Sequence, residues 1–480
     1  MPRVRKPFEP FEVEITDLEP SGWSLGVLPG GREVRVRGAA PGSRLHVQPV
    51  DRRKGGLIAR RLHVVRPPAD AAEPRCAWFG TCGGCTLQEL DPAAQRRLRH
   101  DVAVRTIAPP ASARVHPPVE ASAPWGYRNR VELSYGPARY LTDDELHAGV
   151  PRAGRFLGFH APGWFDRIVD VTRCELVHDD LNALIAALRA VTLAPDAPPP
   201  WDNRDHTGDL RYVRLRHAPT TGDVLVSLYT RDADALEPFV ERVAEAVLAT
   251  PLTSCRVAGF EWVGGDGKAD VARGRTRRVW GDPWVEERLG PLRLRLSRET
   301  FFQSSTDGGR ALYDVIGRAL GEGGALFDLY CGAGTIGMYL AGQFDRVLGV
   351  EVVAQAIEDA RANAERNGVS IELVAAPMEE ALHHLAQQDR PLRVVVDPPR
   401  AGLHPKVTRA IADLDADVLV YVACHPASLG RDHPTLTRGG WELTDLWTVD
   451  LFPHTGHVES VARFARTGLT EEASRSPLPG

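Results

Sequence analysis

The sequence predicts a three-part α/β protein, with an N-terminal β-barrel, a small central α+β domain and a C-terminal Rossmann-like α/β domain. A chain of 480 residues is too long for one hydrophobic core, so several domains are expected. Short strand-like runs alternate with glycine and proline turns in the first 65 residues, and strands alternate with helices from about residue 286 onward. The fractions of 43% hydrophobic and 25% charged residues are typical of a globular protein.

Residues 1–65 are expected to form the barrel. The runs FEVEI, EVRVRG, RLHVQPV and IARRLHVV are separated by turn residues at the spacing of a small barrel. Twelve basic and seven acidic side chains give this segment a balance of +5, whereas the whole chain carries −5. Such a positive segment suits a phosphate backbone, although a solvated surface is an equally good interpretation of the charge alone.

Residues 66–285 are expected to form the central domain, after a proline- and alanine-rich linker. Its strand-like runs are RVELSY, LRYVRLRH and DVLVSLYT, and its helix-like runs are LNALIAALRAV and ALEPFVERVAEAVL.

Three of the seven cysteines, Cys76, Cys82 and Cys85, lie within ten residues of one another. A long chain with an odd number of cysteines and no export signal argues against a disulfide framework, so this spacing indicates thiolate ligands of a metal. The fourth ligand could be Cys174 or Cys255. The spacing fits zinc and an iron–sulfur cluster equally well.

The third domain contains a glycine loop, CGAGTIG, between a strand and a helix. Gly332 and Gly334 allow the backbone to turn tightly and approach a ligand, and Glu351 ends the next strand, where a carboxylate can accept ribose hydroxyls. This combination predicts a nucleotide-type site. It does not distinguish NAD from S-adenosylmethionine.

Two further residues follow buried strands of the same domain. Asp397 begins DPPRAGL after RVVV, and Cys424 ends VLVYVAC, so both are expected at the edge that the glycine loop lines. A cysteine that adds to C6 of uracil makes C5 nucleophilic, and a base must then remove the C5 proton. The segment FPHTGHVES offers Glu459, His454 and His457 as that base, and chemistry alone leaves the choice open.

Together these motifs closely resemble the RNA (uracil-5-)-methyltransferase family, in particular its ribosomal RNA branch, over about residues 8–466. FFQSS, DLYCGAGTIG, GVE, DPPRAGL, ACHPASLGRD and FPHTGHVES occur in the order of the family. The resemblance implies an OB-like TRAM barrel that binds RNA at 1–65, a central domain with an iron–sulfur cluster at 66–285 and an S-adenosylmethionine-dependent methyltransferase domain at 286–468. A disordered tail is expected at 469–480.

The resemblance also implies roles for single residues. Cys424 is the nucleophile, Glu459 the proton-abstracting base, and Asp397 lies between cofactor and uracil. The implied ligands of a [4Fe-4S] cluster are Cys76, Cys82, Cys85 and Cys174, which leaves Cys255 spare. The implied contacts to S-adenosyl-L-methionine are Gln303, Tyr330, Gly332, Gly334, Thr335, Glu351 and Asp397. The chain departs from the family at His425 and Thr335, where asparagine occurs in relatives.

We therefore expect a cytoplasmic monomer that methylates C5 of uridine in large-subunit ribosomal RNA, with transfer RNA as the alternative substrate. No apolar stretch approaches the length of about 20 residues that a membrane span needs. Other classes are an NAD-dependent oxidoreductase and an RNA-binding module without catalysis. An RNA cytosine-5 methyltransferase would carry a cysteine in the acid–proline loop, where Arg400 stands.

Overall fold

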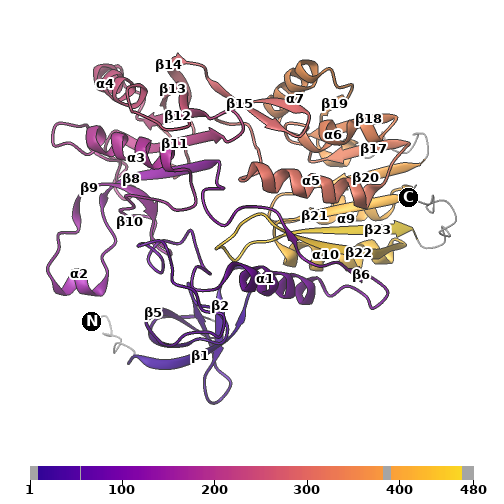
Figure 1. The fold of residues 1–480 in the computed structure, drawn as a ribbon, viewed down its shortest axis with the longest axis horizontal. Helices are drawn as coiled ribbons and strands as arrows, with labels where there is room; N and C mark the ends of the chain where they lie inside the picture. Colours follow the sequence, from indigo (N-terminus) through magenta and orange to yellow (C-terminus); the bar gives the residue numbers. More distant parts are fainter. Residues whose placement is uncertain (1–8, 54–55, 382–390, 467–480) are drawn as a thin grey trace.

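The computed structural model describes residues 9–53, 56–381 and 391–466 (Figure 1). Figure 1 shows the barrel below two larger lobes, with the central lobe at the upper left. The C-terminal lobe, called the catalytic lobe because the sequence predicts the active site there, lies at the right. The tail expected at 469–480 and the basic residues Arg3, Arg5, Lys6 and Lys54 lie outside these ranges. Within the ranges, each helix is too short or too polar to cross a lipid bilayer.

The N-terminal strands close into a five-stranded barrel in the order β1-β2-β3-β5-β4, as the sequence predicts. Alternate side chains point inward because successive residues of a strand face opposite sides, and Val13, Ile15, Val34 and Val47 belong to its core. The strands are β1 (Phe11–Leu18), β2 (Ser24–Val27), β3 (Glu33–Val36), β4 (Arg44–Arg53) and β5 (Gly56–Arg66).

The central lobe contains a seven-stranded sheet in the order β10-β9-β8-β11-β12-β13-β14. The apolar faces of α3 (Asp179–Thr192) and α4 (Glu237–Leu248) pack in one core with this sheet. Its other elements are α2 (Asp143–His147), β8 (Arg130–Ala138), β9 (Ala153–His160), β10 (Ile168–Val169), β11 (Leu210–Ala218), β12 (Asp223–Thr230), β13 (Arg256–Gly264) and β14 (Arg275–Gly281).

The catalytic sheet is mixed rather than purely parallel, which corrects the expectation from sequence. Its order is β19-β18-β17-β20-β21-β23-β22-β6; the first five strands are parallel, and β23 is antiparallel to both β21 and β22. The strands are β17 (Ala325–Leu329), β18 (Arg346–Glu351), β19 (Glu372–Ala375), β20 (Leu392–Val396), β21 (Val418–Ala423), β22 (Trp441–Asp450) and β23 (Glu459–Arg466).

Helices cover both faces of this sheet, as expected. Successive residues of β17, β20 and β21 alternate between two cores; α1, α9 and α10 contribute to one core, and α5 and α6 to the other. The helices are α1 (Pro92–Ile107), α5 (Thr306–Leu320), α6 (Thr335–Leu340), α7 (Ala354–Asn367), α8 (Met378–Ala381), α9 (Pro405–Ala412) and α10 (Pro426–Arg438). Gly368 ends α7 in the left-handed conformation expected for a helix C-terminus.

One helix and two short strands that precede residue 286 in the sequence also join the catalytic lobe. Helix α1 packs against α10, and the short strands β6 (Arg114–Val115) and β7 (Val119–Glu120) pair with β22. The hairpin of β15 (Trp284–Leu289) and β16 (Leu292–Ser297) contacts the central sheet and shares a core with α5.

Candidate active site and cysteine pocket

The glycine loop connects β17 to α6 through backbone conformations that side chains rarely adopt. Tyr330 has a φ of 64°, Gly332 of 54° and Gly334 of 70°. A positive φ at a tyrosine is uncommon and persists only where the surrounding fold enforces it. A Cβ atom built on Gly332 would meet no other atom within 4 Å, so the loop leaves open space in front of its backbone.

Two carboxylates hold this loop in place. Glu351, at the end of β18, accepts hydrogen bonds from the amides of Gly332 at 3.2 Å and Val353 at 3.0 Å. The fully buried Asp328 accepts from the Gly337 amide at 2.9 Å, whereas its Oδ1 has no hydrogen-bond partner in the described part of the chain. Burial raises the pKa of Asp328 to about 7. Sequence reasoning missed Asp328, although an acid inside the buried run ALFDLY was a signal for it.

Gln303 and Thr335 are both buried, and Thr335 directly follows the loop. The Gln303 carbonyl accepts a hydrogen bond from Asn129 Nδ2 at 2.8 Å, so the central lobe fixes the backbone of the FFQSS segment. Thr335 begins α6, and its hydroxyl lies 2.8 Å from the hydroxyl of Tyr313. Asn129 and Tyr313 were not identified from the sequence.

Asp397, Cys424 and Glu459 come together at one edge of the catalytic sheet. Asp397 follows β20, Cys424 follows β21, and Glu459 begins β23, whose antiparallel direction brings its start to the end of β21. Each residue lies within range of the others' charge, since Glu459 and Asp397 both act on the pKa of Cys424 and Asp397 acts on that of Glu459.

Burial is the main influence on the acidity of these three groups. It raises the pKa of Asp397 to about 7 and that of Glu459 well above the usual range. Burial and the two carboxyl groups raise the pKa of the Cys424 thiol to about 12, against a smaller opposing effect of Arg400. Glu459 is 4% exposed, and its Oε2 has no hydrogen-bond partner among residues that the structure describes.

The two histidines that compete with Glu459 have different surroundings. His454 is buried and stacks on Trp125 with ring centroids 3.8 Å apart, while Gln95 contacts both its Nδ1 and its backbone amide. His457 has its pKa lowered to about 4 by burial and by the positive charge of Arg400. His454 is thus part of a packed network, and both rings are held in the neutral form.

The segment 452–458, which leads to Glu459, contacts two other parts of the protein. The amides of Thr86 and Leu87, just after the cysteine motif, donate to the His454 carbonyl at 2.8 and 3.0 Å. At Gly456 an added Cβ would lie 2.8 Å from the Cα of Gly22 in the barrel. The barrel and the cysteine loop therefore both support the segment before Glu459.

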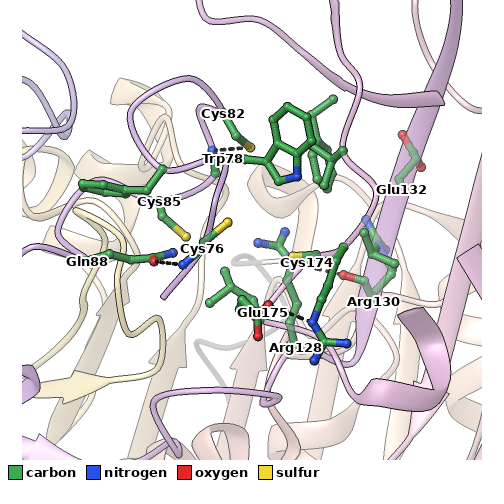
Figure 2. A pocket seen from close by; sticks show the side chains of 17 residues that line it. Cys76, Trp78, Cys82, Cys85, Gln88, Arg128, Arg130, Glu132, Cys174 and Glu175 are labelled. Carbon is green, nitrogen blue, oxygen red and sulfur yellow. Dashed lines mark hydrogen bonds and ion pairs between the residues drawn. The ribbon is translucent and has the colours of Figure 1, made fainter. Parts of the chain in front are cut away.

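Four of the cysteines line one cavity of about 290 Å³. Figure 2 shows Cys76, Cys82 and Cys85 from one loop and Cys174 from the segment before α3 around this space. Burial raises the pKa of Cys82 to about 11 and that of Cys85 to about 12. The same cavity is also lined by Arg128, Arg130 and Arg173. Cys255 is not among the lining residues; it lies beside His178 and His217.

Five arginines of the barrel strands are neutralised by acids within the protein. Arg35, Arg44, Arg60, Arg61 and Arg66 each form an ion pair with a carboxylate. Arg37 has no such pair among the described residues. Its guanidinium lies 4.2 Å from the centroid of the Trp23 ring, and burial and the charge of Arg400 lower its pKa.

The chain is similar to RNA methyltransferases over almost its whole length. The family model described as tRNA (Uracil-5-)-methyltransferase matches residues 292–466. An uncharacterized RNA methyltransferase of Chlorobaculum tepidum is 34% identical over 477 residues, covering 95% of this chain and 96% of the relative. One of Nitratidesulfovibrio vulgaris is 33% identical over 483 residues, covering 97% of each.

A solved structure agrees with this similarity. The Pyrococcus abyssi tRNA (uracil-54, C5)-methyltransferase, in complex with S-adenosyl-L-homocysteine, is 28% identical to this chain and matches it with a TM-score of 0.74. The match covers 95% of this chain and 99% of that chain, so it includes the barrel and the central lobe.

Proposed function

This chain belongs to the RNA (uracil-5-)-methyltransferase family, and we propose that Cys424, Asp397 and Glu459 form its catalytic centre. The reaction transfers a methyl group from S-adenosylmethionine to C5 of a uracil in RNA. The observation that carries the proposal is the convergence of a thiol and two buried carboxyl groups at one sheet edge, next to an open glycine loop.

In the proposed mechanism the thiolate form of Cys424, its proton already lost, bonds through sulfur to C6 of the uracil, and the electrons of the C5–C6 double bond make C5 nucleophilic. C5 forms a bond to the methyl group as the bond between that group and the donor sulfur breaks. Glu459 then removes the C5 proton, the C5–C6 double bond forms again, and Cys424 leaves as a thiolate. The target base must be extruded from its stack to reach this edge.

The surroundings of Glu459 support its assignment as the base. Glu459 acts on the pKa of Cys424, and its Oε2 has no hydrogen-bond partner among the described residues. The Nε2 of His454 is likewise unpartnered there, but this ring stacks on Trp125 and contacts Gln95 through Nδ1. A carboxyl group with a raised pKa is also a stronger base than an ordinary one once it is ionised.

We propose that the glycine-loop edge holds S-adenosylmethionine, and the residues present fit this group. Open space in front of Gly332 admits a ligand to the backbone, and Glu351 is already anchored where it could accept ribose hydroxyls. When bound, the cofactor supplies the methyl group and a sulfonium charge that favours the ionised form of nearby acids. The proposed contacts are Gln303, Tyr330, Gly332, Gly334, Thr335, Glu351 and Asp397.

For the cysteine cavity we propose a [4Fe-4S] cluster held by Cys76, Cys82, Cys85 and Cys174. Four thiolates around a single zinc would lie about 3.8 Å apart, given zinc–sulfur bonds of about 2.3 Å. Within the described ranges, the group of three or more ligating side chains with atoms inside 4.8 Å lies elsewhere, at His178, Asp180 and Cys255. In the part of the chain that the structure describes, no three of the cavity's cysteines form such a close group, which favours the larger cluster over a single zinc, and the lining arginines offset the cluster's negative charge.

We propose that RNA passes between the barrel and the catalytic edge. Arg400 lies close enough to Arg37 for its charge to lower the pKa of Arg37, and a phosphate that contacts both would relieve this repulsion. We accordingly propose a division of the chain into an RNA-binding barrel at 1–65, a cluster domain at 66–285 and a methyltransferase domain at 286–468.

The proposed substrate is large-subunit ribosomal RNA. Transfer RNA is the second candidate, because the Pyrococcus abyssi enzyme whose structure matches 95% of this chain is a tRNA (uracil-54, C5)-methyltransferase. Mass mapping of 5-methyluridine in both RNA classes from a deletion strain tests the two. Loss of a ribosomal methyluridine, restored by the wild-type gene and not by Cys424→Ala, supports the first; loss confined to transfer RNA establishes the second.

A further inference from the structure

A second group of ligating side chains lies in the central lobe, outside the cysteine cavity. Cys255 precedes β13, His178 caps the start of α3, and His217 lies near the end of β11. The Cys255 sulfur is 3.4 Å from His217 Nε2 and 3.7 Å from His178 Nδ1. The ligand atoms of Cys255, His178 and Asp180 all lie within 4.8 Å of one another, and His217 approaches this group through its contact with the Cys255 sulfur.

The two sulfur–nitrogen separations match that of a tetrahedral zinc site. Zinc binds thiolate sulfur at about 2.3 Å and imidazole nitrogen at about 2.0–2.1 Å, so a tetrahedral site separates the two atoms by about 3.5 Å. The two sulfur–nitrogen distances in the structure lie on either side of this value. One cysteine, two histidines and one carboxylate are also a ligand set that zinc accepts.

Hydrogen bonding does not account well for the arrangement. His217 is 5% exposed, and within the described residues the polar contact of its ring is with the Cys255 sulfur, while Nδ1 has no partner. A thiol is a weak hydrogen-bonding group, so a buried imidazole gains little from it. His178 Nδ1 accepts one hydrogen bond, from the Asp180 amide at 3.1 Å, and a metal ion would replace that bond.

The loop that carries Cys255 is fixed before any ion binds. Asp180 accepts hydrogen bonds from the amides of Thr253, Ser254 and Cys255 at 2.8 to 2.9 Å. Such anchoring holds the cysteine in one position against the two imidazoles, as supporting hydrogen bonds do in known metal sites.

We propose that Cys255, His178 and His217, with Asp180 as the fourth ligand or as the anchor of the loop, bind one zinc ion. The ion would join the start of α3, the end of β11 and the start of β13, three segments that are distant in the sequence. This site is separate from the proposed cluster, although Cys174 lies only four residues before His178. A structural zinc ion there would stabilise the lobe that supports the cluster.

The test is the metal content of the full-length protein, purified anaerobically from zinc-supplemented medium and dialysed against a weak chelator. Wild-type protein should contain one zinc per chain. In the Cys255→Ser and His217→Ala variants the zinc content per chain should fall at least about ten-fold while the iron content stays. Cys76→Ser should keep its zinc and lose its iron. His147→Ala, which removes an exposed imidazole in α2, is the matched control and should keep both.

X-ray absorption at the zinc edge gives a second readout that iron does not disturb. One sulfur at about 2.3 Å with nitrogen or oxygen ligands at about 2.0–2.1 Å is the expected ligand shell. Wild-type protein without zinc, zinc bound by four sulfurs, or zinc retained in folded Cys255→Ser and His217→Ala would each overturn the proposal. Circular dichroism establishes that the variants are folded.

Discussion

Ala423 at the end of β21 pairs with Ser460 on the antiparallel strand β23. Cys424 and Glu459 are the residues directly beyond this last pair of the ladder, and directly opposite residues of an antiparallel pair extend to the same face of the sheet. The thiol and the carboxyl group that we assign to addition and proton removal are therefore set side by side by strand register. A shift of one residue in β23 would turn Glu459 to the other face.

Because addition to C6 precedes removal of the C5 proton, the two residues should fail differently. Cys424→Ala should lower turnover at least about 10³-fold and form no covalent RNA complex. Glu459→Gln should form the complex and retain it, because the proton that must leave stays on C5. A denaturing gel with labelled RNA measures both. Glu358→Gln, an exposed exchange on α7, is the control; a Glu459→Gln enzyme with normal turnover would refute the base assignment.

The raised pKa of Glu459 predicts how stability depends on pH. The folded protein binds the proton more tightly than the unfolded chain, so ionising this buried group costs stability as pH rises above about 4.5, and the full cost is reached above the folded pKa. Glu459→Gln should therefore raise the melting temperature at pH 8, by about 2–4 °C for each kcal/mol relieved. The gain should disappear near pH 4. Calorimetry at both pH values, with Glu358→Gln as the control, measures this. An equal gain in melting temperature at pH 4 and pH 8 would contradict the prediction.

Anaerobically purified protein should be brown, with about four iron and four sulfide ions per chain. Replacing any of the four cavity cysteines with serine should bleach it, since each supplies one ligand. Cys255→Ser should keep the colour, because that residue lies outside the cavity. Iron and sulfide analysis with visible spectroscopy measures this. A colourless wild-type protein that holds zinc at the four cysteines would refute the cluster.

Arg37 should contribute to RNA affinity more than to the chemical step. Arg37→Ala should weaken RNA binding and lower the slope of log affinity against log salt by about 0.7–0.9, the value of one phosphate contact. The rate at saturating RNA should change much less. Arg66→Ala is the matched control, since that arginine is paired with Glu14 on the same barrel. Equal salt slopes for the two variants would exclude Arg37 as a phosphate contact.

This substitution is a cleaner test than deleting residues 1–65. The barrel residues Leu18 and Ala40 share a buried cluster with Leu87, Leu90 and Val102, so truncation would expose apolar surface of the remaining protein. A loss of binding by a truncated chain would then mix a missing contact with a damaged fold.

Much of the catalytic edge could be predicted because its signals are local. The glycines after a buried strand, and Asp397 and Cys424 at the ends of apolar runs, follow from short-range pattern. Strand β2 was missed, because four residues with a glycine among them give no alternating signal. Gly26 is required there, since an added Cβ would lie 2.6 Å from the Glu14 carbonyl oxygen.

Other features depend on contacts between distant parts of the chain. The direction of β23 and the docking of α1, β6 and β7 on the catalytic lobe leave no periodic pattern in their own segments. A count of charges likewise cannot tell which arginines are paired, and so the balance of +5 in the barrel did not single out Arg37. Cys255 illustrates the same point, because its histidine partners come from other strands and helices.

The hydrogen bonds from Thr86 and Leu87 to the His454 carbonyl connect the cysteine loop to the segment before Glu459. On the proposed assignment, oxidative loss of the cluster would release that loop and with it the position of the base. Uridine methylation would then decline when iron is scarce or oxygen is abundant, even while the nucleophile itself stays intact. The extent of uridine methylation in the RNA would therefore depend on the cell's iron supply and oxidant exposure.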